Sequence, residues 1–189
     1  FIHQNLENNY IIFFLIYFFT IIIFFTFSLP GGTIPIMASG FFFGFYIGFL
    51  INIIAILIGS YIFIYVLKKI FYKLFNSFYL KFSKKLNNLL QHSSYEYLIL
   101  IRLIAGVPLF IQNLFFSFMN ITKSKFFISS SLGFSPIIFF LTYFGSKIYE
   151  IYEINYSNYS EVFSKEFIFL ILLYVLFLIF RIIYNLKKK

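Results

Sequence analysis

One cation lies inside a stretch of apolar residues long enough to enter a membrane. Arg102 follows Glu96 closely, and in a helix its Cα would lie about 9 Å beyond that acid. A cation buried in a membrane is costly and needs a partner. No acid occurs between Asn8 and Leu67 or between Tyr97 and Lys147. The partner of Arg102 is therefore expected to be neutral, or to be an anion that the chain does not supply.

The neutral candidates are few. They are Asn52, Gln112, Asn113, Ser39, Ser117 and backbone carbonyl groups. A lipid phosphate would also fit the planar guanidinium fork. Pro108 lacks an N–H and would leave carbonyls free nearby, which Asn113 could orient together with a headgroup. We predict that Arg102, Pro108 and Asn113 bind substrate. The alternative is that Arg102 extends to the cytoplasmic headgroups.

The composition predicts an all-α integral membrane protein. The 189 residues are 61% hydrophobic and only 11% charged, whereas soluble domains carry about 25% charged residues. There is no Cys, there is no Asp, and both histidines lie outside the expected spans. We therefore expect no enzyme activity, no metal and no cofactor. The net charge of +9 comes from lysines that flank spans, which favours anionic lipid headgroups or lipid phosphates as partners over nucleic acid. Self-association into a homo-oligomer is left open.

Runs without charge give the expected elements. Their lengths predict about four transmembrane helices and two re-entrant helical hairpins, because bent backbone at membrane depth must be buried in protein or line a cavity. The expected spans are Tyr10–Leu29, 50–67, 126–146 and 167–186. The expected hairpins are 33–49 and 97–122, and 147–166 is expected to be a polar loop.

Residues 68–96 have a helical apolar period with lysines mostly on the other face. This pattern predicts an amphipathic helix, either in the membrane interface or packed on the bundle. Lysine-rich segments stay cytoplasmic, so 68–96 and the C-terminus are expected inside and 147–166 outside. The hairpins then enter from opposite faces, which is the arrangement of an inverted repeat. We expect one multi-pass domain over 1–189 in a cell (inner) membrane.

Glycines and prolines mark where the backbone bends or approaches another segment closely. Pro30, Gly31 and Gly32 should end the first span. Gly40, Gly44 and Gly48 recur with a spacing of four, which would place them on one helix face for close packing, with or without a role in shaping a substrate path.

These positions resemble the VTT domain of the SNARE-associated Golgi protein family, within the DedA superfamily. The resemblance covers about 28–147, with a C-terminal transmembrane helix at about 167–186 outside it. Ala105 and Ser117 depart from the family pattern, as do Lys68 and the absence of acids before the first hairpin. The matching residues are Pro30, Gly31, Gly32, Gly40, Phe43, Gly44, Gly48, Gly59, Arg102, Pro108, Asn113, Phe126, Gly133, Pro136 and Gly145.

The resemblance implies two hairpins that face each other and the movement of phospholipids or polyprenyl-phosphate-type lipids across the bilayer. The missing acids argue against proton coupling. A structural or assembly protein that supports envelope integrity is the alternative function. Two helices interrupted by glycine and proline favour the transporter, because a scaffold has no need of them.

Overall fold

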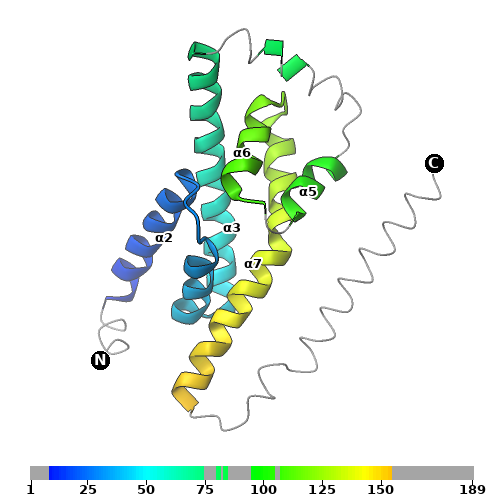
Figure 1. Ribbon diagram of the computed structural model, residues 1–189. Coiled ribbons are helices and arrows are strands. Elements are labelled where there is room, and N and C mark those ends of the chain that lie inside the picture. The colour runs from blue at the N-terminus through cyan, green and yellow to red at the C-terminus, as the bar shows by residue number, and fades with distance from the viewer. Residues whose placement is uncertain (1–8, 75–79, 82, 85–94, 105–106, 155–189) are drawn as a thin grey trace, which may run out of the picture. The chain divides into compact units, whose positions relative to one another are not determined.

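The computed structural model describes residues 9–74, 80–81, 83–84, 95–104 and 107–154. All of its secondary structure in these ranges is helical, and it falls into two units, 1–149 and 150–189. The description below concerns the first unit and the end of its last helix (Figure 1). The helices are α2 (Tyr10–Thr26), α3 (Thr33–Leu74), α5 (Tyr95–Leu103), α6 (Leu109–Phe118) and α7 (Lys123–Ile154).

Helix α2 ends earlier than the expected Leu29. The N–H of Ser28 donates to the carbonyl of Phe25, and that of Leu29 donates to Phe24. With Ser28 at φ 49°, these two bonds form a Schellman motif, which closes a helix with a residue in the left-handed region. Its 17 residues extend about 26 Å, less than the hydrocarbon core of about 30 Å. Helix α2 is therefore shorter than the full span predicted over Tyr10–Leu29.

Helix α3 is two helical arms joined at Gly44. This residue has φ 74° and ψ 174°, a non-helical conformation inside the helix that is essentially restricted to glycine. The chain reverses there, so that residues 33–43 (the first arm) fold back on residues 45–74 (the second arm). The predicted hairpin 33–49 thus contains a real reversal. The residues of this hairpin that follow the turn are, however, continuous with the predicted span 50–67 in one helix.

The reversal corrects the expected glycine face. Because the helix turns at Gly44, Gly40 and Gly48 lie on opposing arms and not on one helix face. A Cβ on Gly48 would lie 2.9 Å from the carbonyl of Ser39, whereas nothing lies within 4 Å of a Cβ on Gly44. Gly48 permits close backbone packing, and Gly44 permits the turn.

Helix α2 and the first arm run antiparallel. The rings of Tyr10 and Phe43 are 6.0 Å apart at one end, the Tyr17 hydroxyl donates to the carbonyl of Pro35 midway, and a Cβ on Gly32 would meet Phe25 at 3.3 Å at the other end. Between them lies the break at residues 27–32, where Gly31 has φ 84°. Aromatic packing of this kind buries large side chains between the two helices.

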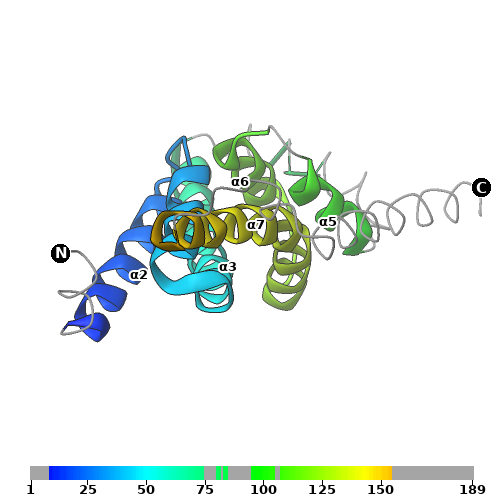
Figure 2. The ribbon, with the colours of Figure 1, turned by 90° about the horizontal axis from the view of Figure 1, so that it is seen from below.

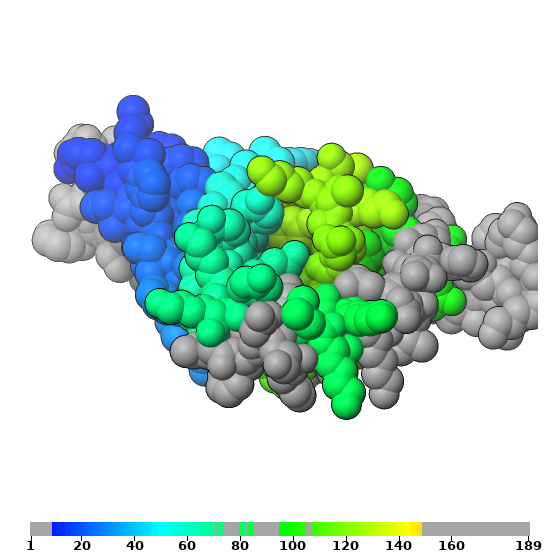
Figure 3. All heavy atoms as spheres, turned by 90° about the horizontal axis from the view of Figure 1, so that it is seen from above, coloured from blue at the N-terminus to red at the C-terminus, as the bar shows by residue number. Residues whose placement is uncertain are grey.

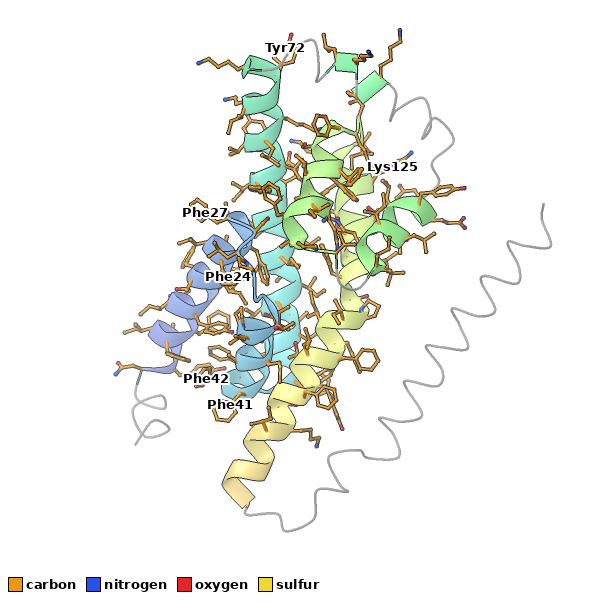
Figure 4. All side chains as sticks on the ribbon, viewed as in Figure 1. Phe24, Phe27, Phe41, Phe42, Tyr72 and Lys125 are labelled. Carbon is orange, nitrogen blue, oxygen red and sulfur yellow. The ribbon has the colours of Figure 1, made fainter. Side chains whose placement is uncertain are left out.

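The second arm packs against both α2 and α6, and Figure 3 shows it beside the N-terminal segments. It approaches α2 closely at Gly59, where a Cβ would lie 2.8 Å from the backbone nitrogen of Thr26. Figure 4 labels Phe42 beside the turn of α3, Tyr72 near the end of the second arm, and Phe24 and Phe27 at the end of α2 beside it. The break after α2 therefore meets the second arm part-way along its length.

Helices α5 and α6 are the two arms of the predicted hairpin 97–122. Pro108 precedes α6 with φ −54° and ψ 139°, and a proline fixes its own φ and suits the start of a helix. The arms are linked by Arg102 in α5 and Asn113 in α6, whose side chains are 2.8 Å apart. At the far end of α6 the carbonyl of Met119 accepts a hydrogen bond from Lys68 at 3.1 Å.

Helix α7 is longer than the predicted span 126–146 and contains Pro136. It continues to Ile154, so the first residues of the predicted loop 147–166 are helical. The first arm packs on it without side chains between the backbones: Gly40 faces the carbonyl of Thr142, and Gly145 faces that of Met37. Figures 1 and 2 show this arm beside the later part of α7. Two glycines, one from each helix, make this contact possible.

Two helices in the described ranges are long and apolar enough to cross a membrane, Thr33–Ile70 and Lys123–Ile148. The first contains the turn at Gly44, but residues 45–70 alone extend about 39 Å, which exceeds the hydrocarbon core of about 30 Å. Large apolar side chains such as Phe19, Ile54 and Leu132 are exposed, which suits a lipid environment. Most of the predicted amphipathic helix 68–96 and all of the predicted span 167–186 lie outside the described residues.

Candidate anion site

Arg102 ends inside the helix bundle. It lies near the end of α5, on the face that packs against α7, and only 2% of its surface is exposed. Gly133 of α7 makes room for it, because a Cβ there would meet the Ile99 carbonyl at 3.0 Å and the Cγ of Arg102 at 3.2 Å. This burial contradicts the alternative in which the guanidinium extends to the headgroups.

The guanidinium is held by two neutral oxygens. Its Nε donates to Ser130 Oγ at 3.2 Å, and its Nη1 donates to Asn113 Oδ1 at 2.8 Å. Its Nη2 is buried and has no hydrogen-bond partner. No acid is among the contacts of Arg102 in the described part of the chain. A buried cation therefore keeps part of its donor capacity unused.

Aromatic rings surround the same group. The guanidinium carbon is 3.9 Å from the ring centroid of Phe116, 4.7 Å from that of Phe134 and 5.7 Å from that of Phe126. Rings within about 6 Å attract a cation through their quadrupoles. They offset part of the missing counter-charge, but they accept no hydrogen bond in the plane of the guanidinium.

Asn113 joins the site to the first half of the chain. This fully buried amide accepts from Arg102 and donates from Nδ2 to Ser28 Oγ at 3.1 Å and Ser60 Oγ at 3.4 Å. Ser28 lies in the break after α2, and Ser60 lies in the second arm of α3. Ser130 adds α7 to the network. The break after α2 therefore meets α3, α5, α6 and α7 around one arginine.

The structure brings together two of the three predicted substrate-binding residues, Arg102 and Asn113. Pro108 is exposed at the start of α6. Its carbonyl accepts from the backbone N–H groups of Ile111 and Gln112, and the carbonyl of Val107 accepts from the Gln112 side chain. The prediction that Pro108 leaves free carbonyls nearby is therefore wrong for these two groups.

The other predicted neutral partners lie elsewhere. Asn52 forms a second polar cluster between the arms of α3 and α7, where its Nδ2 donates to Ser39 Oγ, to Thr142 Oγ1 at 3.0 Å and to the carbonyl of Ile36 at 3.2 Å. Its Oδ1 is buried without a partner. The hydroxyl of Ser117 donates to the carbonyl of Leu114. None of these groups is a partner of Arg102.

Sequence reasoning missed Ser28, Ser60 and Ser130. Serine is common in membrane helices, where its hydroxyl can bond to a carbonyl of its own helix, so its presence alone indicates little. Only the Ser28 position carries a signal that could have been found. It comes directly before Leu29, Pro30 and the two glycines, where a helix end was already expected.

The fold and site define a class of protein: an all-helical membrane protein with interrupted helices around a buried cation. Residues 29–147 match the family model of the VTT domain. The match covers more than half of the chain, which therefore belongs to the VTT domain family, as the resemblance predicted. No curated protein and no solved structure matches the chain.

Proposed function

We propose that this protein moves phospholipids or polyprenyl-phosphate-type lipids across the bilayer, as a transporter or scramblase without chemistry of its own. Arg102 would bind the lipid phosphate and Asn113 would orient the guanidinium. Membership of the VTT domain family supports a function in the membrane.

The observation that carries the proposal is the unused Nη2 of Arg102. This nitrogen is buried and unpaired, in a site whose other partners are neutral. Leaving a buried charged donor unpaired is unfavourable. A phosphate oxygen would satisfy it, because charge-assisted bonds from arginine to phosphate are short and strong.

The arrangement of the helices supports the same proposal. In Figure 1, α2 and the first arm lie beside the lower part of the second arm of α3, α6 lies beside its upper part, and α5 lies next to α7. The break after α2 meets α6 at the hydrogen bond between Ser28 and Asn113. Sites of this kind, where two interrupted segments from opposite sides meet, are typical of transporters built as inverted repeats. We propose that α2 with the first arm, and α5 with α6, enter the membrane from opposite faces.

We further propose a multi-pass orientation in a cell (inner) membrane with residues 68–96 and the C-terminus in the cytoplasm. The support is the lysine asymmetry, since basic loops remain on the cytoplasmic side. Anionic headgroups at that surface would be attracted to the same lysines.

Movement of labelled lipids in liposomes tests the function directly. The purified full chain is reconstituted into vesicles that carry an acyl-labelled phospholipid in both leaflets, and a membrane-impermeant quencher is added outside. Lipid movement should let the quencher remove the signal of both leaflets, whereas protein-free vesicles should lose only that of the outer one. Equal quenching with and without the protein, in vesicles shown to contain it, would instead support the structural or assembly role.

A further inference from the structure

A second buried group without a partner lies on α6, and its chemistry is opposite to that of the arginine. Gln112 is buried, with 5% of its surface exposed. Its Nε2 donates to the carbonyl of Val107 at 3.1 Å, which fixes the amide, and its Oε1 has no hydrogen-bond partner. Hairpin α5–α6 therefore holds one unpaired buried donor and one unpaired buried acceptor.

Gln112 shares a face of α6 with a residue that contacts the arginine. Gln112, Asn113 and Phe116 are buried on this helix, and the last two contact the guanidinium of Arg102. Gln112 is one helix turn from Phe116, a spacing that puts their Cβ atoms about 5–6 Å apart on one helix face. The Phe116 ring in turn contacts the guanidinium, so Gln112 borders the surroundings of Arg102.

A phosphate alone cannot satisfy both groups. Ionised phosphate oxygens accept hydrogen bonds and would pair with Nη2, but the amide oxygen of Gln112 needs an N–H or O–H donor. A phosphate monoester has a second pKa of about 6, so at neutral pH it offers few protons. The two unpaired atoms are complementary to a phosphodiester with a donor group a few bonds away.

Resting on the proposed function, we infer that the preferred ligand is a phospholipid whose headgroup carries a hydrogen-bond donor, an ammonium or a hydroxyl, and that Gln112 accepts this bond. Ethanolamine and glycerol headgroups meet the requirement. A choline headgroup has the same phosphodiester and positive charge but no N–H, and a polyprenyl monophosphate has no headgroup donor. A buried polar site discriminates strongly against an analogue that leaves its own groups unpaired.

The test is a headgroup series in liposomes that contain the full chain. Acyl-labelled phosphatidylethanolamine, its N-monomethyl and N,N-dimethyl derivatives and phosphatidylcholine are compared, because the first three keep at least one N–H and the last has none. We expect the first three to move at comparable rates, and phosphatidylcholine to move about tenfold more slowly, the size of one lost buried hydrogen bond. Phosphatidylglycerol should move with the fast group.

A variant assigns the selectivity to one side chain. Gln112→Met keeps the length of the side chain and removes the amide acceptor, so the ratio of ethanolamine to choline transport should fall to about one. Ser135→Ala is the control, because Ser135 is exposed on α7 and the ratio should stay as in the wild type. The comparison uses the ratio within each preparation, so a lower yield of folded variant does not affect it.

The outcomes separate this inference from the function on which it rests. If no headgroup moves faster than in protein-free vesicles, the proposed function fails. If all headgroups move at equal rates in the wild type, the function stands and the inference is overturned. A selectivity that survives in Gln112→Met would also overturn the inference, because a group other than Gln112 would then accept the hydrogen bond of the headgroup.

Discussion

Arg102 is buried among groups that bind it without neutralising it. Ser130 and Asn113 supply oxygens, and three phenylalanine rings supply negative faces. Replacement of this arginine by lysine keeps the charge but changes the geometry, because a lysine is a point charge without the planar fork. We therefore expect the positive charge alone to be insufficient for the function of Arg102.

Arg102→Lys and Arg102→Ala should both abolish lipid movement while the protein still inserts and accumulates. Lysine cannot reach Ser130 and Asn113 together and also present a free N–H pair, so we expect transport to fall at least about tenfold, the effect of one lost charged hydrogen bond. Transport per folded molecule in liposomes is the measurement. Full activity in the lysine variant would show that positive charge alone suffices, and loss of the folded protein in both variants would indicate a structural role.

Asn113→Asp should separate stability from transport. The new carboxylate would lie 2.8 Å from Nη1 of Arg102 and supply the missing counter-charge inside the protein. We expect the thermal midpoint in detergent to rise by about 2–4 °C, the shift that a gain of about 1 kcal/mol gives a chain of this size. Lipid movement should be lost, because the carboxylate competes with a lipid phosphate.

Asn113→Ala is the matched control for that variant. It leaves Arg102, Ser28 and Ser60 without their shared partner, so both the midpoint and the transport rate should fall. An aspartate variant that transports as well as the wild type would show that no external anion is needed at this arginine.

The arginine and its amide partner could be predicted from the sequence for a simple reason. Charged and amide side chains are rare in apolar stretches, so each one is conspicuous. Gln112 and Asn52 were visible for the same reason, but sequence spacing did not show that Asn52 belongs to a separate cluster with Ser39 and Thr142. That separation depends on where the chain reverses.

At the level of the helices, the turn at Gly44 explains most of the differences from expectation. A regular spacing of glycines predicts one packing face only if the helix continues through them. Nothing in the residue types around Gly44 distinguishes a turn from a packing contact, since both favour glycine. The presence of a hairpin could be predicted there, whereas the pairing of its arms could not.

The close approach at Gly48 can be tested by a single methyl group. Gly48→Ala places a Cβ 2.9 Å from the backbone of Ser39, and overpacking of this kind costs about 1–3 kcal/mol. We expect a lower thermal midpoint and less accumulated protein. Ile47→Ala is the control, because Ile47 is exposed on the neighbouring position and should have little effect. Equal behaviour of the two variants would show that the arms can separate without loss.

The same reasoning explains the helix ends. The break after α2 was predicted from Pro30 and the glycines, but the left-handed Ser28 ends the helix before them. Helix α7 runs past the predicted end of its span because no glycine or proline occurs between Lys147 and Ile154. Loss of hydrophobicity ends a membrane span without ending a helix.

For the whole molecule, the second arm of α3 is the element that defines orientation. Tyr46 and Tyr72 are exposed near its two ends, and the residues between them extend about 39 Å along a helix. This length exceeds the hydrocarbon core of about 30 Å. The two positions should therefore lie on opposite sides of the membrane.

Cysteine labelling tests that topology in a chain that has no cysteine of its own. Tyr72→Cys should react only with permeant reagents, and Tyr46→Cys should react with impermeant reagents added outside, because lysines cluster beyond Tyr72. Ser157→Cys, in the predicted outer loop, should behave like Tyr46→Cys. Labelling of Tyr46 and Tyr72 from the same side would refute the spanning arrangement.

The convergence of four helices and one helix break on Arg102 has a consequence for biogenesis. The groups that accommodate this cation come from both sides of it in the chain. Ser28 and Ser60 precede it and bind Asn113, its hydrogen-bond partner. Ser130 and Phe134 follow it and contact it directly. In the proposed arrangement, α5 and α6 would enter the lipid during synthesis before α7 exists to enclose the charge. A nascent chain paused at that stage would expose an unshielded arginine, which is costly in lipid. The insertion of α7 would then complete the fold, and ribosome stalling before Ser130 should mark the chain for membrane proteolysis.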